Sequence, residues 1–185
     1  MSLTESNMLD LTTTAPDFTL TNVVTGKAVS RDDLMAQKGL LVMFICAHCP
    51  YVKHINEGLA ALGKDYATKP IGIVAISSND ANTHPADSPA GLKQQAGTFG
   101  FGFPYLYDES QAVAHAYKAA CTPDFFLFDG DLKLVYRGQF DSSRPGNGVP
   151  VTGENLRNAI DLVLAGKQVP TDQRPSIGCN IKWKA

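Results

Sequence analysis

Two cysteines separated by two residues form the clearest chemical motif of this 185-residue sequence, Cys46-Ala47-His48-Cys49. A thiolate is the nucleophile of thiol–disulfide exchange, and a second thiol nearby can attack the mixed disulfide and release the product. Cys46 is expected to lie where the unpaired N–H groups and the positive end of the dipole of the following helix converge, which favours its ionisation. The motif therefore predicts Cys46 as an accessible, acidic attacking thiol. It predicts Cys49 as the resolving thiol, buried one turn further on, with a pKa kept high by apolar surroundings.

Two alternatives to redox chemistry remain open for this pair. A C-x-x-C motif can be half of a zinc site, but Cys121 and Cys179 are isolated and supply no second pair. A copper or zinc carrier would instead use Cys46, Cys49 and His48, or Cys179 in place of the histidine. Both cysteines could also be inert core residues, as small thiols often are. The metal content of the purified, reduced protein distinguishes the metal carrier from the redox protein.

The histidine inside the motif is a candidate for tuning the thiols. An imidazole beside Cys46 can donate a hydrogen bond to a thiolate or carry positive charge, which stabilises the reduced form and makes the disulfide more oxidising. We interpret His48 in this way. His54, His84 and His115 are expected to be ordinary surface or hydrogen-bonded histidines.

The motif lies between a strand and a helix in the predicted order of elements. Residues 40–45 are apolar throughout, as in a central strand covered on both faces. Apolar residues then recur every three or four positions through residues 52–66, which predicts an amphipathic helix with Pro50 in its first turn. Residues 71–76 form a second apolar run. Strand, helix and strand together predict a right-handed βαβ unit with a parallel pair of strands.

The other predicted elements come from turn and capping signals. They are a hairpin turning at Gly26, a helix at 88–98 capped by Ser88, a strand at 103–106, a helix at 109–118, a hairpin of 125–128 and 132–136, and a helix from a Thr152 cap to Gly166.

Composition and charge narrow the class of protein. We expect one domain over residues 15–185, preceded by residues 1–14 that are disordered or derived from an expression vector. A net charge of −2 without a basic run argues against a nucleic-acid partner, and the longest apolar run is too short to span a membrane. The first fifteen residues show no export signal, so we expect a cytoplasmic protein. We expect no metal or organic cofactor.

Three segments carry a resemblance to a known family: Phe-Ile-Cys-Ala-His-Cys-Pro-Tyr-Val at 44–52, Cys-Thr-Pro-Asp-Phe-Phe at 121–126, and Ile-Gly-Cys-Asn-Ile-Lys-Trp-Lys at 177–184. The chain resembles the thioredoxin-like redoxins, and within them the peroxiredoxin-like, AhpC/TSA-related antioxidant group that carries a thioredoxin-type C-x-x-C motif. The resemblance implies an α/β thioredoxin fold, a central mixed β-sheet flanked by helices, with an N-terminal β-hairpin extension and a C-terminal tail. It also implies a thiol–disulfide oxidoreductase that acts on protein or small-molecule disulfides and is recycled by a reductant such as thioredoxin or glutathione.

The resemblance assigns further roles. It implies that Thr122-Pro123 is a cis-proline element opposite the dithiol, where it tunes the site. Cys121 and Cys179 are then possible accessory thiols, one near the dithiol and one in a tail that packs back on the domain.

The sequence departs from the peroxiredoxins in the residues around the reactive cysteine. Counted back from Cys49, their proline and threonine positions hold Val42 and Cys46, so we expect slow peroxide reduction. A weak thiol peroxidase that uses the same cysteines, with Cys49 attacking, is the alternative.

Overall fold

The apolar run predicted at 40–45 forms strand β4 (Gly39–Phe44), in which all six residues are buried. The structure, a computed structural model, describes residues 3–185. Leu41 and Met43 on one face of β4 pack in a cluster with the helices. Val42 and Phe44 on the other face pack in a second cluster. A strand covered on both faces is expected to be apolar at every position, as this one is.

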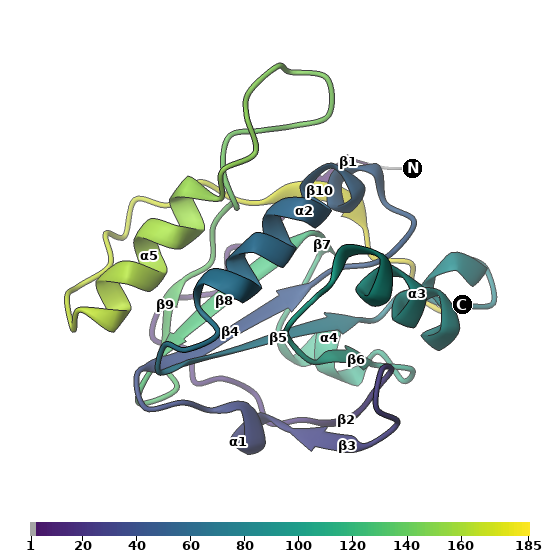
Figure 1. The fold of residues 1–185 in the computed structure, drawn as a ribbon, viewed down its shortest axis with the longest axis horizontal. Helices are drawn as coiled ribbons and strands as arrows, with labels where there is room; N and C mark the ends of the chain where they lie inside the picture. Colours follow the sequence, from purple (N-terminus) through teal and green to yellow (C-terminus); the bar gives the residue numbers. More distant parts are fainter. Residues whose placement is uncertain (1–2) are drawn as a thin grey trace.

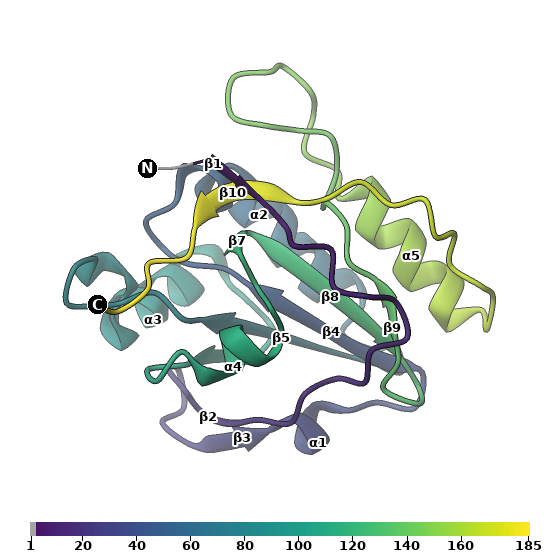
Figure 2. The same ribbon diagram turned by 180° about the vertical axis from the view of Figure 1, so that it is seen from behind.

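Helices cover both faces of the sheet (Figures 1 and 2). Residues of α2 (Pro50–Asp65), α3 (Pro89–Phe99) and α5 (Glu154–Leu164) belong to the first cluster, and those of α4 (Ala112–Ala116) to the second. Two short elements, α1 (Arg31–Leu34) and the 3-10 turn η1 (Pro85–Asp87), lie in connections. The predicted layering, with helices on both sides of a central sheet, is confirmed.

The strands form a mixed arrangement. One ladder runs β3-β2-β6-β5, in which β2 is Thr19–Asn22 and β3 is Ala28–Ser30, and a second runs β4-β8-β9. β5 (Ile71–Ser77) and β6 (Tyr105–Tyr107) pair in parallel. β4 pairs antiparallel with β8 (Asp124–Asp129), which pairs in turn with β9 (Leu134–Tyr136). β4 and β5 lie side by side (Figure 1), joined by a hydrogen bond of 3.0 Å from the Ile45 N–H to the Ile76 carbonyl oxygen.

The local signals predicted one hairpin turn and one helix cap correctly, and a second helix cap incorrectly. β2 (Thr19–Asn22) and β3 (Ala28–Ser30) form the expected hairpin, with Gly26 in the left-handed region at φ 72°. Ser88 caps α3 as predicted, accepting a hydrogen bond from the Gly91 N–H. Gly153, and not Thr152, is the N-cap of α5, although the Thr152 hydroxyl still accepts a hydrogen bond from the Glu154 N–H at 3.3 Å. The Asp141 carboxylate binds the backbone N–H groups of Thr152 and Gly153.

The N-terminal segment is part of the fold, so the prediction of disorder for residues 1–14 is wrong over residues 3–5. β1 (Leu3–Glu5) pairs antiparallel with β10 (Ile177–Asn180), which pairs in turn with β7 (Cys121–Thr122). This small sheet places one strand from near each end of the described chain beside β7 (Figure 2). Met1 and Ser2 lie outside the described residues.

Among residues 3–185, no helix combines the length and the apolar character needed to cross a bilayer.

Candidate functional site

The dithiol lies in the turn between β4 and α2, and Pro50 lies in the first turn of the helix as predicted, but the two cysteines do not lie at the predicted places relative to the helix N-terminus. Cys49, not Cys46, is the N-cap of α2, and Pro50 is its first helical residue. Proline is favoured there, because its missing N–H would have no partner in the first turn of a helix. The helix N-terminus therefore favours ionisation of Cys49.

The predicted difference in acidity between the two thiols is reversed. Both side chains are fully buried, so the predicted accessibility of Cys46 is wrong. Burial raises the pKa of Cys46 well above its usual range, and a hydrogen bond with Cys49 and the charge of Asp87 raise it further. The pKa of Cys49, in contrast, is lowered to about 5. The largest cause is the hydrogen bond from Cys46; contacts with Cys179 and the Val52 N–H lower the pKa further, while burial acts in the opposite direction. Cys49 is therefore the more acidic of the two thiols.

The segment opposite the dithiol has the predicted cis peptide bond, between Thr122 and Pro123. The Thr122 hydroxyl oxygen lies 3.4 Å from the Cys46 sulfur, and the Thr122 carbonyl oxygen lies 3.4 Å from the Cys49 sulfur. One residue of this segment therefore contacts both thiols.

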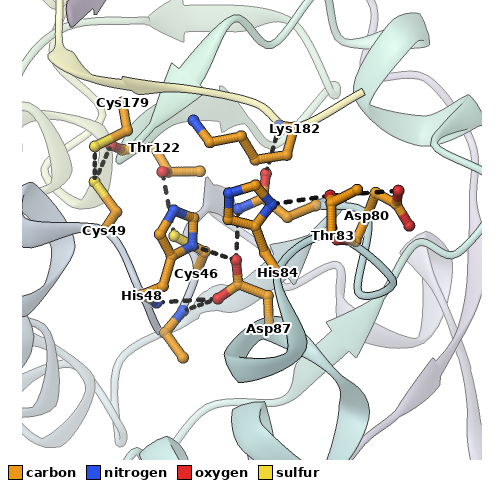
Figure 3. A network of polar contacts seen from close by, with 12 residues as sticks. Cys46, His48, Cys49, Asp80, Thr83, His84, Asp87, Thr122, Cys179 and Lys182 are labelled. Atoms are coloured by element: carbon orange, nitrogen blue, oxygen red, sulfur yellow. Dashed lines mark hydrogen bonds and ion pairs between the residues drawn. The ribbon is translucent and has the colours of Figure 1, made fainter. Parts of the chain in front are cut away.

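The two remaining cysteines differ in their relation to the dithiol. The sulfur of Cys179 lies 2.7 Å from that of Cys49 (Figure 3). The sulfur of Cys121 faces the carbonyl oxygens of Pro123 and Ser176 instead, at 3.5 and 4.0 Å. Burial also raises the pKa of Cys121 far above its usual range. The tail thus brings one of the two accessory thiols into contact with the dithiol.

Asp87 is a site residue that the sequence analysis missed. Its side chain is fully buried, and its carboxylate accepts hydrogen bonds from the backbone N–H groups of Ala47 (2.8 Å) and His48 (3.0 Å) and from the Asn79 side chain (2.8 Å). The same carboxylate binds Nδ1 of His48. Burial opposes its charge, but the hydrogen bonds from His48 and Asn79 hold the pKa of Asp87 below its usual range.

This carboxylate fixes the orientation of the His48 ring (Figure 3). With Asp87 ionised, Nδ1 of His48 carries the hydrogen and donates it, which leaves a lone pair on Nε2. Nε2 is buried and has no hydrogen-bond partner among residues 3–185. The ring also lies against that of His84, with 4.6 Å between the ring centroids. Asp87 is thus the positioning residue of the His48 ring, and ligand atoms of Cys46, His48 and Asp87 lie within 4.8 Å of one another.

Only a topological signal could have identified Asp87 from the sequence. It lies in the loop that follows β5, and loops at the carboxyl ends of neighbouring strands meet at one edge of an α/β sheet. The dithiol follows β4 at the same edge. No motif distinguishes Asp87 from the other polar residues of that loop.

A metal ion would find a different set of ligands from the one predicted. Among the described residues, one group of histidine, cysteine and acidic side chains places its ligand atoms within 4.8 Å of one another, namely Cys46, His48 and Asp87. The predicted set used Cys49 in place of Asp87. A thiolate, an imidazole and a carboxylate are all ligands that zinc accepts.

The fold and the site together define a class of protein. A strand, a dithiol and a helix opposite a cis-proline are arranged as in the thioredoxin-like redoxins. The thioredoxin domain of a thiol-disulfide oxidoreductase from Bacteroides vulgatus superposes with a TM-score of 0.62 at 18% identity, covering 81% of this chain and 97% of that one, which shows the shared fold.

The family assignment follows from the sequence. Residues 11–137 match the AhpC/TSA family, and the chain belongs to that family, as the resemblance predicted. Its members are in general oxidoreductases of the thiol–disulfide and peroxiredoxin-like kinds, with thiol substrates.

Two solved structures are much more similar to this chain. An uncharacterized conserved protein from Geobacillus kaustophilus is 55% identical with a TM-score of 0.97, covering 100% of this chain and 97% of that one. A hypothetical protein from Sinorhizobium meliloti is 50% identical with a TM-score of 0.96, covering 98% and 99%. No curated protein sequence matches the chain.

Proposed function

We propose that the protein is a thiol–disulfide oxidoreductase in which Cys49 attacks a protein or small-molecule disulfide and Cys46 resolves the adduct. The observation that carries this proposal is the position of Cys49 at the N-terminus of α2, beside the neutral Cys46 thiol. These roles are the reverse of those predicted from the spacing alone.

Attack begins with the Cys49 thiolate. It forms a bond to one sulfur of the substrate disulfide, and the other sulfur leaves as a thiolate and takes up a proton. Cys49 then has no negative charge. Because that charge is one of the causes that raise the pKa of Cys46, the loss of the charge makes Cys46 easier to ionise.

Resolution uses Cys46 and the histidine beside it. Nε2 of His48 accepts the Cys46 proton, and the Cys46 sulfur attacks that of Cys49, releasing the second substrate thiol. The net reaction converts one substrate disulfide and two protein thiols into two substrate thiols and a Cys46–Cys49 disulfide. Thioredoxin or glutathione would reduce that disulfide again. Since both sulfurs are buried, the turn at Ala47 and His48 must open to admit the substrate.

Peroxide reduction is a second candidate, which membership of the AhpC/TSA family favours. In that reaction Cys49 would become a sulfenic acid, and Cys46 would condense with it to the same disulfide. The threonine that peroxiredoxins place three residues before the reactive cysteine is Cys46 here. We therefore propose that any peroxidase activity is weak.

A metal carrier is a third candidate, supported by the ligand geometry of Cys46, His48 and Asp87. Purification under reducing conditions, followed by elemental analysis, tests it. A stoichiometric amount of copper or zinc that Asp87→Asn removes would favour this function over disulfide exchange.

Equilibration with mixtures of reduced and oxidised glutathione tests the main proposal. Trypsin releases residues 39–53, which contain both Cys46 and Cys49, as one peptide. We expect this peptide to become two hydrogen atoms lighter as the mixture becomes more oxidising, with the same midpoint in a Cys121→Ser control. A peptide that keeps both thiols in oxidised glutathione, or collects only glutathione adducts, would overturn the proposal.

A further inference from the structure

The Cys49 sulfur has two cysteine neighbours and can form a bond with only one of them at a time. A hydrogen bond with Cys46 lowers its pKa, and the Cys179 sulfur lies 2.7 Å away (Figure 3). The proposed exchange reaction uses only the first neighbour. Cys179 also lies outside residues 11–137, which match the family.

The position of Cys179 is fixed by strands on both sides. In β10 it pairs with Leu3 of β1 and with Thr122 of β7, the residue that contacts both dithiol sulfurs. The preceding residue must be glycine, because a Cβ at Gly178 would overlap the Thr122 carbonyl oxygen. The contact between the two sulfurs therefore follows from the register of a sheet and not from a loosely placed tail.

The residues after Cys179 tie the same strand to the rest of the site. The Ile181 N–H binds the Ala120 carbonyl oxygen at 3.1 Å. The Lys182 N–H binds the side chain of Asn79 at 2.8 Å, and Asn79 in turn binds Asp87. The tail thus connects the dithiol to the loop that positions His48.

The ionisation states suit a transfer of the disulfide. Burial and the hydrogen bond to Cys49 raise the pKa of Cys179 to about 12, so its thiol is neutral while Cys49 is charged. Once Cys49 is joined to a substrate sulfur, this charge disappears. The nearby Lys182, which lowers the pKa of Cys179, then favours its thiolate.

We propose that Cys179 is a third redox-active thiol of the site, an alternative resolving residue that forms a disulfide with Cys49. In the mixed disulfide between Cys49 and a substrate, the Cys179 sulfur attacks the Cys49 sulfur. The substrate sulfur leaves and takes the Cys179 proton, and a Cys49–Cys179 bond results. The electron balance is that of ordinary exchange, with the substrate disulfide as the oxidant. This proposal rests on the proposed function.

The aromatic disulfide 5,5′-dithiobis(2-nitrobenzoate) tests it, because each substrate thiol released is coloured and can be counted. In the Cys46→Ser protein we expect two coloured thiols per molecule and a covalent link between tryptic peptides 39–53 and 168–182. In Cys46→Ser/Cys179→Ser we expect one coloured thiol to be released and the adduct to persist. Release of the second coloured thiol should be at least tenfold slower than in Cys46→Ser. Cys46→Ser/Cys121→Ser serves as the matched control and should behave as Cys46→Ser.

The outcomes separate the two proposals. One equivalent and a stable adduct in Cys46→Ser, with the wild type releasing two, would overturn the role of Cys179 and leave the proposed function intact. No reaction at Cys49 in any variant would overturn the proposed function itself. Thermal melts, and a parallel Cys46→Ala series, show whether a loss of reaction reflects unfolding.

Discussion

Replacing Cys46 by alanine is expected to raise the pKa of Cys49, because the hydrogen bond from Cys46 is the largest single cause of its low value of about 5. A thiol of that pKa is roughly 99% ionised at pH 7, whereas an unperturbed cysteine of pKa ~8.5 is about 3% ionised. If the substitution raises the pKa by one unit, the ionised fraction at pH 5 falls from about one half to about one tenth. The rate of alkylation at pH 5, relative to its plateau, should then fall about fivefold.

The assay is the pH dependence of alkylation by iodoacetamide, followed at peptide 39–53 by mass spectrometry. The midpoint is the readout and not the absolute rate, because a thiolate of higher pKa is also intrinsically more nucleophilic. Cys46→Ser is the matched control, since its hydroxyl can still donate to Cys49, and its midpoint should move less. A wild-type midpoint near 8.5 at Cys49, or an unchanged midpoint in Cys46→Ala, would refute the assignment of the thiolate.

Three further predictions concern stability, redox potential and substrate. Burial raises the pKa of Asp124, which follows the cis-proline, to about 7, so the folded protein favours the protonated form and loses stability as pH rises from about 4 to about 7. In urea unfolding, Asp124→Asn should therefore gain on the order of 2 kcal/mol of stability relative to wild type between pH 5 and pH 8. A difference that stays constant with pH would contradict this. The Cys46–Cys49 couple should be more oxidising than a thioredoxin at about −270 mV, because the low pKa of Cys49 stabilises the reduced form; a potential at or below that value in glutathione titrations would contradict this. Stopped-flow oxidation of the reduced protein by hydrogen peroxide should be orders of magnitude slower than the diffusional limit of about 10⁸–10⁹ M⁻¹s⁻¹, and fast saturable turnover would make peroxide the better candidate substrate.

The elements with strong local signals could be predicted from the sequence. The six buried residues of β4, the periodic apolar face of α2 and the Ser88 cap depend mainly on neighbours within a few positions. The sequence also contained a signal for the start of α2. Proline is favoured as the first residue of a helix, and Pro50 in that position makes Cys49 the N-cap. The prediction instead placed Cys46 at the helix N-terminus and Cys49 one turn into the helix, and the error in the acidities of the two thiols follows from that.

The parts that could not be predicted depend on distant contacts. Leu3 pairs with Cys179 at the other end of the chain, and no local pattern in residues 3–5 specifies that partner. Asp87 reaches His48 only through the meeting of two loops at one sheet edge. The acidity of Cys49 depends on three sulfur atoms converging, of which the motif itself supplies only two.

The identity of the attacking thiol is the central claim, and trapping tests it most directly. Both Cys46→Ser and Cys49→Ser are made in a Cys179→Ser background, so that no third thiol can resolve an adduct. Each reduced protein is mixed briefly with oxidised glutathione at pH 7 and its intact mass is measured. We predict a single glutathione adduct on the variant that keeps Cys49 and none on the variant that keeps Cys46. An adduct that forms only on the variant with Cys46 would contradict the account.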